Sequence, residues 1–270
     1  MPRREILSPA QREELLVIPI DRAGLIEHYV LSEQDLSLIR QRRGDHNRLG
    51  IALQLALLRF PGTALLADEA PPQELINFLA LQLQVPSSAW GEYAQRDETR
   101  REHLLELQTH YGIRSFTLGQ YRSLAAWLLS TALQTNRGIA LVRAAIEELR
   151  RRSVIVPRLP VLERLCAETA LRAQRQLFAT LSANLTDNQR RQLDAVLEPL
   201  EGRQLSVLAW LRSPSGIPNP RNILTHINAL REHGIVFPDA LLTHVSPIGW
   251  EHINLTGDYT WHANRRVAEG

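Results

Sequence analysis

The sequence predicts an all-α protein, built as a multi-helix array. Leu, Ala, Gln, Glu and Arg are abundant, and these residue types have high helix propensities. Apolar residues recur with the helical period along most of the chain, and no alternating run is long enough to predict a strand. With 270 residues, of which 44% are hydrophobic, the chain is large enough to bury one good core or two small ones.

Helix start and stop residues give the order of the predicted elements. Ser8, with Pro9 at the first helical position and Gln11 completing a capping box, begins a helix that runs to Val17. The residues predicted to cap later helices are Ser32, Asp45, Asp97, Thr117 and Thr186. The later predicted helices span residues 33–42, 45–59, 71–84, 86–94, 97–111, 117–135, 139–152, 160–181, 187–197 and 221–232, with an extended connector at 154–157 and a linker at 213–220.

The densest basic segment is a short turn between two of these helices, Arg42-Arg43-Gly44-Asp45-His46-Asn47-Arg48. Gly44 is predicted to end the first helix in the left-handed conformation, and Asp45 is predicted to cap the second. Arg40, Arg42, Arg43 and Arg48 would then gather beside the N–H donors of a helix N-terminus. This arrangement predicts a phosphate-binding surface. The alternative is an ordinary helical hairpin with a solvated charged turn.

Two segments have the pattern of a helix-turn-helix module, residues 31–60 and residues 104–133. In the second, Thr117 caps a candidate recognition helix that carries Gln120, Tyr121 and Arg122. Gln and Arg have the bidentate geometry that reads adenine and guanine. A plain helical hairpin is again the alternative.

The balance of charge favours nucleic acid locally rather than over the whole chain. The net charge is only +2, although the isoelectric point is about 9.0. Every basic residue other than His is Arg, which pairs with phosphate and guanine bidentately, although GC-rich codon usage explains that bias as well. A third basic cluster, Arg150-Arg151-Arg152 with Arg158, fits phosphate contacts that position a protein on DNA, or a solvated helix end.

Several classes of function are excluded by what the sequence lacks. No P-loop, Rossmann fingerprint or nucleophile elbow occurs, and the His residues lack metal-ligand spacing, so no cofactor or metal is predicted. Cys166 is the only cysteine and lies in an apolar helical stripe, which predicts a buried structural thiol. No signal peptide or membrane-spanning run is evident, so we expect a cytoplasmic protein without a membrane partner.

The pattern DL..IR.RRGDHNRLG.A.QL.LLR.PG stands at residues 35–62. It closely resembles a pattern near the start of transposases of the Tn-three (Tn3) family, the replicative class II unit transposons. The resemblance continues through Tyr111-Gly112-Ile113-Arg114, Tyr121-Arg122 and Trp127-Leu128, and it covers the chain to about residue 227. It implies a helical region that binds the terminal inverted repeats of the transposon.

The segment SPIGWEHINLTGDY, at residues 246–259, resembles the extreme C-terminus of the same family. Family members carry a long region between these two ends, with an RNase H-like domain and its DDE carboxylates. Those carboxylates have no counterpart that can be matched here, so we expect the catalytic domain to be absent through an internal deletion and the protein not to be an enzyme. The predicted division is a DNA-binding region at 1–153, a second one at 154–227 and a poorly packed tail at 228–270.

The predicted function is therefore binding of double-stranded DNA at transposon inverted repeats, as part of a transposase or derived from one. Full-length transposase and a second copy of this chain are further expected partners. The alternatives are a helical interaction module that regulates full-length transposase, and a non-functional remnant. The residues predicted to contact DNA are Arg40, Arg42, Arg43, His46, Asn47, Arg48, Arg114, Gln120, Tyr121, Arg122, Arg150, Arg151, Arg152, Arg158 and Arg221.

Overall fold

The structure is a computed structural model, and it describes residues 6–65, 70–93, 97–135, 137–183 and 185–199, together with residues 206, 208, 209, 224 and 228. The chain divides into two compact units, residues 1–173 and residues 174–270. The regular structure of the described residues consists of eleven α-helices and one 3₁₀ helix, and β-pairing is limited to isolated bridges. The prediction of an all-α fold is confirmed.

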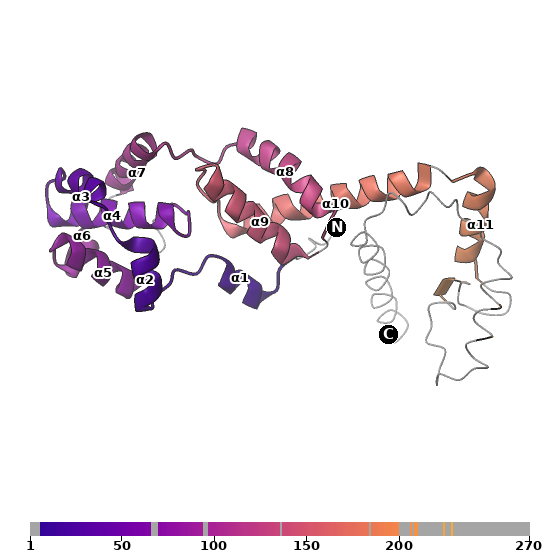
Figure 1. Ribbon diagram of the computed structural model, residues 1–270, viewed down its shortest axis with the longest axis horizontal. Helices are drawn as coiled ribbons and strands as arrows, with labels where there is room; N and C mark the ends of the chain where they lie inside the picture. The colour runs from indigo at the N-terminus through magenta and orange to yellow at the C-terminus, as the bar shows by residue number, and fades with distance from the viewer. Residues whose placement is uncertain are drawn as a thin grey trace. The chain divides into compact units, whose positions relative to one another are not determined.

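The helices of the described residues follow one another along the chain as labelled in Figure 1. They are α1 (Pro9–Leu15), α2 (Arg22–Tyr29), α3 (Glu33–Arg40), α4 (Asp45–Arg59), α5 (Gln73–Leu83), η1 (Ser87–Ala89), α6 (Trp90–Tyr93), α7 (Asp97–Tyr111), α8 (Leu118–Ala132), α9 (Gly138–Arg151), α10 (Leu159–Ala183) and α11 (Asp187–Leu197).

Side-chain caps begin several helices where the sequence predicts them. The Ser8 hydroxyl accepts from the Gln11 N–H at 3.3 Å, and the Gln11 side chain accepts from the Ser8 N–H at 2.9 Å, which completes the capping box before α1. Thr117 accepts from the Gln120 N–H before α8, and Thr186 forms a capping box before α11. Each cap satisfies N–H groups that have no partner inside the helix.

Helix α4 begins differently from the prediction, and α2 is a helix that was not predicted. Asp45 is the first residue of α4 rather than its cap, because Gly44 adopts a φ of +80° and turns the chain so that Asp45 already has helical geometry. α2 was not predicted at all, since the sequence Arg22–Tyr29 has hardly any apolar periodicity. It is capped by Asp21, whose carboxylate accepts from the Gly24 N–H at 3.0 Å.

The first lobe comprises α2 to α7 and packs around α4 (Figure 1). Ten of the fifteen residues of α4 are buried, so this helix is enclosed nearly all round. Gly50 allows the closest approach, because a Cβ atom there would lie 2.3 Å from ring atoms of Tyr93 in α6. The first lobe therefore depends on a small residue in its central helix.

The second lobe comprises α1, α8, α9 and α10 up to residue 173, within the first unit. Its core contains Leu128 of α8, Leu149 of α9 and Leu165 of α10, and the predicted buried thiol, Cys166, is confirmed there. Burial raises the pKa of the Cys166 thiol to about 12. Leu7 packs into the same core, so the chain enters the second lobe first, leaves to build the first lobe and returns at α8.

Backbone hydrogen bonds join the two lobes. The Arg114 N–H donates to the Ser153 carbonyl at 2.8 Å, and the Ile155 N–H donates back to the Arg114 carbonyl at 2.9 Å. The Val156 N–H donates to the Gly62 carbonyl at 2.9 Å. The predicted extended connector at residues 154–157 is thus the segment that holds the chain after α4 and the chain after α7 together.

The second unit is described only in part. Its labelled helices are the end of α10 and the whole of α11. Val196 is the buried residue of α11. The predicted tail at residues 228–270 and nearly all of the predicted helix at 221–232 lie outside the described residues. In the described part of the chain, no helix is both long enough and apolar enough to cross a membrane.

Candidate nucleic-acid interface

The predicted basic turn lies between α3 and α4, and the first turn of α4 carries one acidic residue, Asp45, but no side-chain cap. Gly44 is the N-cap of α4, and no side chain caps the first turn of that helix. The N–H donors and the positive end of the helix dipole are therefore not neutralised by a capping side chain. Gly44 has a φ of +80°, a conformation that L side chains rarely adopt, so the turn favours glycine at this position.

Two arginines of the turn hold it in place. The Arg42 guanidinium donates to the Glu106 carboxylate of α7, and 29% of the Arg42 side chain is exposed. The Arg48 Nε donates to the Arg42 carbonyl at 3.0 Å, and the Arg48 Nη1 lies 3.6 Å from Asp45 Oδ1. These contacts fix the turn against α7 and against its own backbone.

His46 and Asn47 also make contacts within the lobe. The His46 Nδ1 lies 3.2 Å from Glu92 Oε2 of α6. The Asn47 Nδ2 donates to the Arg43 carbonyl at 2.9 Å. Both residues therefore help to shape the turn that presents its arginines.

Arg40 and Arg43 have a different environment. Both side chains are exposed, and within the described part of the chain neither guanidinium has a hydrogen-bond or ion-pair partner. Both residues belong to the segment between the end of α3 and the start of α4. Of the four arginines predicted to gather here, these two are available to an outside anion, and Arg48 is half-exposed.

A buried carboxylate near the start of α3 joins three helices of the first lobe. Asp35 of α3 is fully buried and accepts from both terminal nitrogens of Arg59, at 2.7 and 2.6 Å, and from the Tyr111 hydroxyl at 2.6 Å. Burial alone would raise the pKa of Asp35, but hydrogen bonds from Arg59, Tyr111 and Ser32 outweigh it and hold the pKa far below its usual range. One charged group thus ties α3, α4 and α7 together.

A second buried polar cluster ties α4, α6 and α7. The Gln54 Nε2 donates to the Tyr93 hydroxyl at 2.6 Å and to the Arg100 carbonyl at 2.8 Å. The Tyr93 hydroxyl also lies 3.2 Å from the His103 Nδ1. Burial and the nearby Arg42 charge lower the pKa of His103 to about 4, so this imidazole is neutral at physiological pH.

The predicted second helix-turn-helix segment presents its side chains on two sides of α8. Arg122 is exposed without a polar partner among the described residues, and Gln120 is half-exposed in the first turn. Tyr121 turns inward, because its hydroxyl donates to Glu168 of α10 at 2.5 Å and its ring meets Phe116 edge-on. The structure therefore separates Tyr121 from the other two predicted residues.

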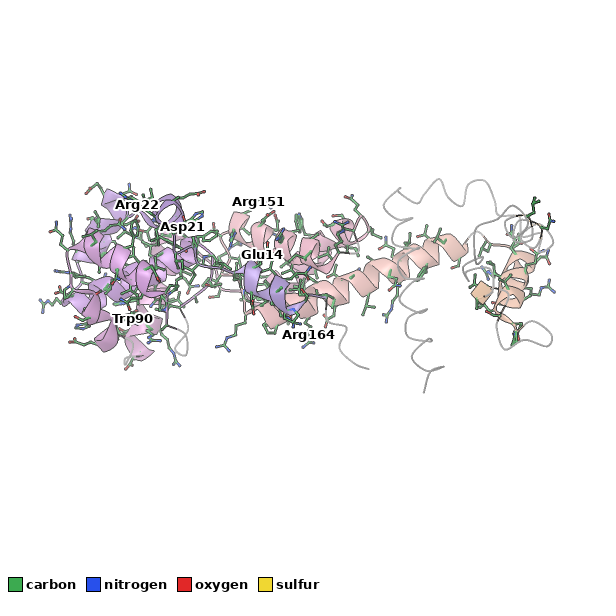
Figure 2. The ribbon with its side chains drawn as sticks, turned by 90° about the horizontal axis from the view of Figure 1, so that it is seen from below. Glu14, Asp21, Arg22, Trp90, Arg151 and Arg164 are labelled. Carbon is green, nitrogen blue, oxygen red and sulfur yellow. The ribbon has the colours of Figure 1, made fainter. Side chains whose placement is uncertain are left out.

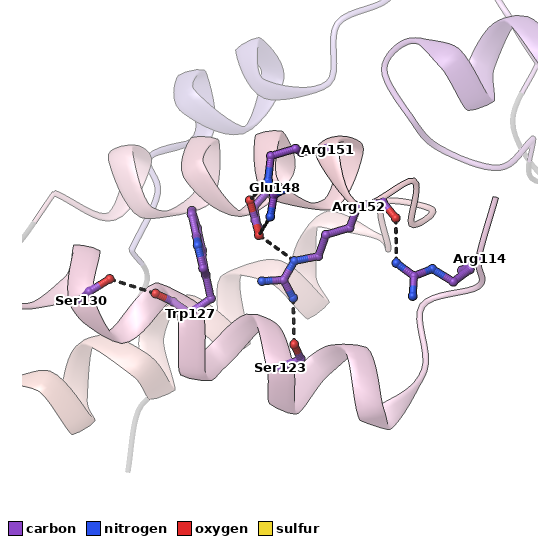
Figure 3. A network of polar contacts seen from close by, with 7 residues as sticks. All are labelled: Arg114, Ser123, Trp127, Ser130, Glu148, Arg151 and Arg152. Atoms are coloured by element: carbon purple, nitrogen blue, oxygen red, sulfur yellow. Dashed lines mark hydrogen bonds and ion pairs between the residues drawn. The ribbon is translucent and has the colours of Figure 1, made fainter. Parts of the chain in front are cut away.

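The third basic cluster is also divided. Arg150 points toward the first lobe, where its Nε donates to the Pro61 carbonyl at 2.8 Å. Arg151 and Arg152 both donate to Glu148, and the Arg114 Nη2 donates to the Arg152 carbonyl at 2.9 Å (Figure 3). Arg158 is exposed and has an interaction partner, and Arg221 lies outside the described residues.

Some partner residues were missed by sequence reasoning. The spacing of Glu148 to Arg151 and Arg152 is i,i+3 and i,i+4, which predicts helical ion pairs, so this contact was available from the sequence. Glu106 is separated from Arg42 by 64 residues, and no local pattern connects them. In the described residues, no group of three His, Cys, Asp or Glu side chains could hold a metal ion, and Asp239 and Asp258 lie outside that part.

Comparison with known proteins identifies the family. A domain of unknown function, DUF4158, matches residues 6–169, which contain both lobes, and the Tn3 transposase DDE domain matches residues 174–259. The chain belongs to the Tn3 transposase family. The resemblance stated from the sequence pattern is thereby confirmed.

Several Tn3-family transposases are similar over most of this chain. The transposase of transposon Tn3926 from Escherichia coli is 48% identical over 231 residues, which is 86% of this chain and 23% of the relative. The transposase of Tn501 from Pseudomonas aeruginosa is 43% identical over 246 residues, or 91% of this chain and 25% of the relative. The chain thus spans about a quarter of the length of the curated relatives it matches.

The comparisons overturn one prediction. The DDE domain was predicted to be absent and the protein not to be an enzyme, but the Tn3 transposase DDE domain matches residues 174–259 and the relatives are transposases. The prediction was wrong for two reasons. It required carboxylates in a metal-binding arrangement, and it treated the segment at 246–259 as an isolated tail. The match points to an enzyme family.

Proposed function

We propose that this chain acts in DNA transposition by binding double-stranded DNA at the terminal inverted repeats of a transposon. The observation that carries the proposal is the pair of exposed guanidinium groups, Arg40 and Arg43, in the segment that leads into the uncapped start of α4. A helix N-terminus favours anions, and guanidinium groups pair with phosphate oxygens. The family membership supports DNA at transposon ends as the source of those phosphates.

The roles of the turn residues follow from their contacts. Arg40 and Arg43 would contact phosphates, with Arg48 as a weaker third contact. Arg42, His46 and Asn47 would shape the turn, because each is engaged within the lobe. Phosphate contacts set the register of a protein on the duplex without reading its sequence.

Base contacts are assigned to the start of α8 in this proposal. The N-terminal part of a recognition helix reaches base edges in the major groove, and Gln120 in the first turn and Arg122 just after it have side chains outside the core. Tyr121 would support the helix from the inner side through its contact with Glu168. Full-length transposase and a second copy of this chain remain proposed partners.

The test is binding to a duplex that carries a terminal inverted repeat, with a scrambled duplex of the same composition as competitor. We expect preferential binding to the repeat, weakened by Arg43→Ala and unchanged by Arg22→Ala, an exposed arginine of α2 outside the predicted set. Equal affinity for both duplexes would overturn the assignment to inverted repeats. Absence of binding at low salt would overturn the DNA-binding proposal altogether.

A further inference from the structure

The outer face of α8 carries an exposed tryptophan and no acidic residue. The helix Leu118–Ala132 contains no Asp or Glu, and its one charged residue is Arg122. Trp127 is 39% exposed, although indole is among the most favourable side chains to bury. Ser123, one helical turn earlier, and Ser130 are exposed as well, and Figure 3 shows the indole rising from α8 on the same side as Ser123.

One carboxylate on the neighbouring helix organises two arginines next to this face. Glu148 of α9 accepts from Arg151 Nε and Nη2, both at 2.7 Å, and from Arg152 Nε at 2.6 Å. The Arg152 Nη1 donates in turn to the Ser123 hydroxyl of α8 at 2.9 Å, which closes a bridge between α8 and α9 (Figure 3). The network thus links the exposed face of α8 to the end of α9.

The charges in this network are unequally exposed. Only 3% of the Glu148 side chain is exposed, against 71% of the Arg151 side chain, which lies at the outer edge of the second lobe (Figure 2). The hydrogen bonds from Arg151, followed by those from Arg152, hold the pKa of Glu148 down to about 2, so its carboxylate is ionised at neutral pH. In this ion pair, the Arg151 guanidinium is therefore exposed to solvent, whereas the Glu148 carboxylate is not.

A buried carboxylate that holds an exposed guanidinium reduces the cost of using that guanidinium. A free Arg side chain loses rotamer entropy when it binds a phosphate, and a side chain already fixed by two hydrogen bonds loses less. Arg151 keeps further N–H donors on its outer side, since guanidinium has five and the contact with Glu148 uses two nitrogens.

We propose that Glu148 is a positioning residue for DNA: it holds the exposed Arg151 guanidinium at the end of α9, so that this guanidinium and Trp127 of α8 contact the sugar–phosphate backbone of a duplex. The inference rests on the proposed function and adds a contact surface to it. Duplex DNA is the occupant because α8 offers hydroxyls and a guanidinium without any carboxylate, and the carboxylate that bridges Arg151 and Arg152, Glu148, is shielded, although Glu147 of α9 is exposed. Arg152 keeps α8 and α9 in register, and Trp127 packs against the backbone.

This assignment makes an unusual prediction about charge. Removing a negative charge from a DNA-binding protein normally strengthens binding, because the net positive charge rises. Glu148→Gln should instead weaken binding, since the neutral amide no longer holds the Arg151 guanidinium. The neighbouring Glu147 is exposed and provides the matched control, so Glu147→Gln should leave the affinity equal or higher.

The experiment measures fluorescence anisotropy of a labelled repeat-end duplex over a range of salt concentrations, with the full chain and its variants. We expect Glu148→Gln, Arg151→Ala and Trp127→Ala each to weaken binding by about three- to tenfold, and Arg151→Ala to reduce the salt slope by about one unit. A merely structural role of Glu148 would lower the unfolding temperature without changing the salt slope of the folded protein.

The outcomes separate this inference from the proposed function. Glu148→Gln that is folded and binds as tightly as the wild type, or more tightly, would overturn the inference, while weaker binding by Arg43→Ala would still support the function. If Glu148→Gln does not fold, the variants of the two exposed residues test the inference instead. Unchanged binding by both Arg151→Ala and Trp127→Ala would then overturn it. A wild-type chain that binds no duplex would overturn both proposals.

Discussion

The Arg150 guanidinium lies over the Phe60 ring, with 4.7 Å between the guanidinium carbon and the ring centroid. The same ring is also stacked by His28, at 4.0 Å between centroids and an interplanar angle of 5°. The Arg150 Nε also donates to the Pro61 carbonyl at 2.8 Å. Burial lowers the pKa of Arg150, because desolvation disfavours the charged guanidinium. The Arg150 side chain therefore makes its contacts within the protein. This contact fastens α9 of the second lobe to the end of α4 in the first.

Arg150→Ala should therefore lower stability more than it changes the electrostatics of DNA binding. The lost hydrogen bond and cation–π contact predict a loss of about 2 kcal/mol in the free energy of unfolding. Arg122→Ala, an exposed position without such contacts, should change stability by less than about 0.5 kcal/mol. Urea denaturation compares the two variants. An Arg150→Ala variant as stable as Arg122→Ala would show that the contact does not hold the lobes together.

The Asp35 cluster should be the most sensitive polar site of the first lobe. Asp35→Asn removes the charge that Arg59 and the Tyr111 hydroxyl surround, and it leaves the guanidinium uncompensated, at a cost of about 2 to 4 kcal/mol. Glu33→Gln, on the same helix but exposed, is the control and should be nearly neutral. Thermal unfolding measures both, and equal melting temperatures would contradict this account of the α3–α4–α7 contact.

His103 should make the stability of the first lobe depend on pH between about 4 and 6.5. Its pKa is about 4 in the folded chain and 6.5 as a free side chain, so the unfolded state binds the proton first as pH falls. The stabilisation is complete above pH 6.5 and declines toward pH 4, by at most about 3 kcal/mol. His103→Gln should flatten this part of the profile. A parallel profile for wild type and variant in urea titrations would refute the assignment.

Gly50 and Gly91 form a matched pair for the packing of α4 against α6. A Cβ atom at Gly50 would lie 2.3 Å from the Tyr93 ring, whereas nothing lies within 4 Å of one at Gly91. Gly50→Ala should therefore destabilise the lobe by about 1 to 3 kcal/mol, because the ring has to move. Gly91→Ala should be neutral or stabilising by up to about 1 kcal/mol, since alanine has the higher helix propensity. Similar effects at the two positions would mean that α6 does not pack closely on α4.

Local sequence rules predicted much of this fold. The boxes at Ser8 and Thr186 and the cap at Thr117 involve residues only three positions apart, so propensity and capping geometry were enough to place those helices. The start of α4 was misplaced by one residue because the positive φ of Gly44 takes over the role assigned to Asp45. α2 was missed because tertiary packing, rather than periodicity, stabilises it.

The candidate site shows the same limit at longer range. The basic clusters could be found in the sequence, but the hydrogen-bond partners of their arginines could not. Arg42 donates to Glu106, 64 positions away, and Arg150 donates to Pro61, 89 positions away. Such contacts depend on how the helices pack, and single-sequence patterns do not contain that information. Arg40 and Arg43 cannot be distinguished from Arg42 by charge or spacing, and the structure distinguishes them by the absence of a partner among the described residues.

The central claim is that the exposed arginines of the α3–α4 turn contact DNA phosphates, and the salt dependence of binding tests it most directly. The affinity for a repeat-end duplex is measured against salt concentration for the wild type and for the Arg40→Ala/Arg43→Ala double variant. The account predicts a salt slope smaller by about two units, because each lost phosphate contact releases about one counterion fewer. An unchanged slope in a folded double variant would contradict the claim.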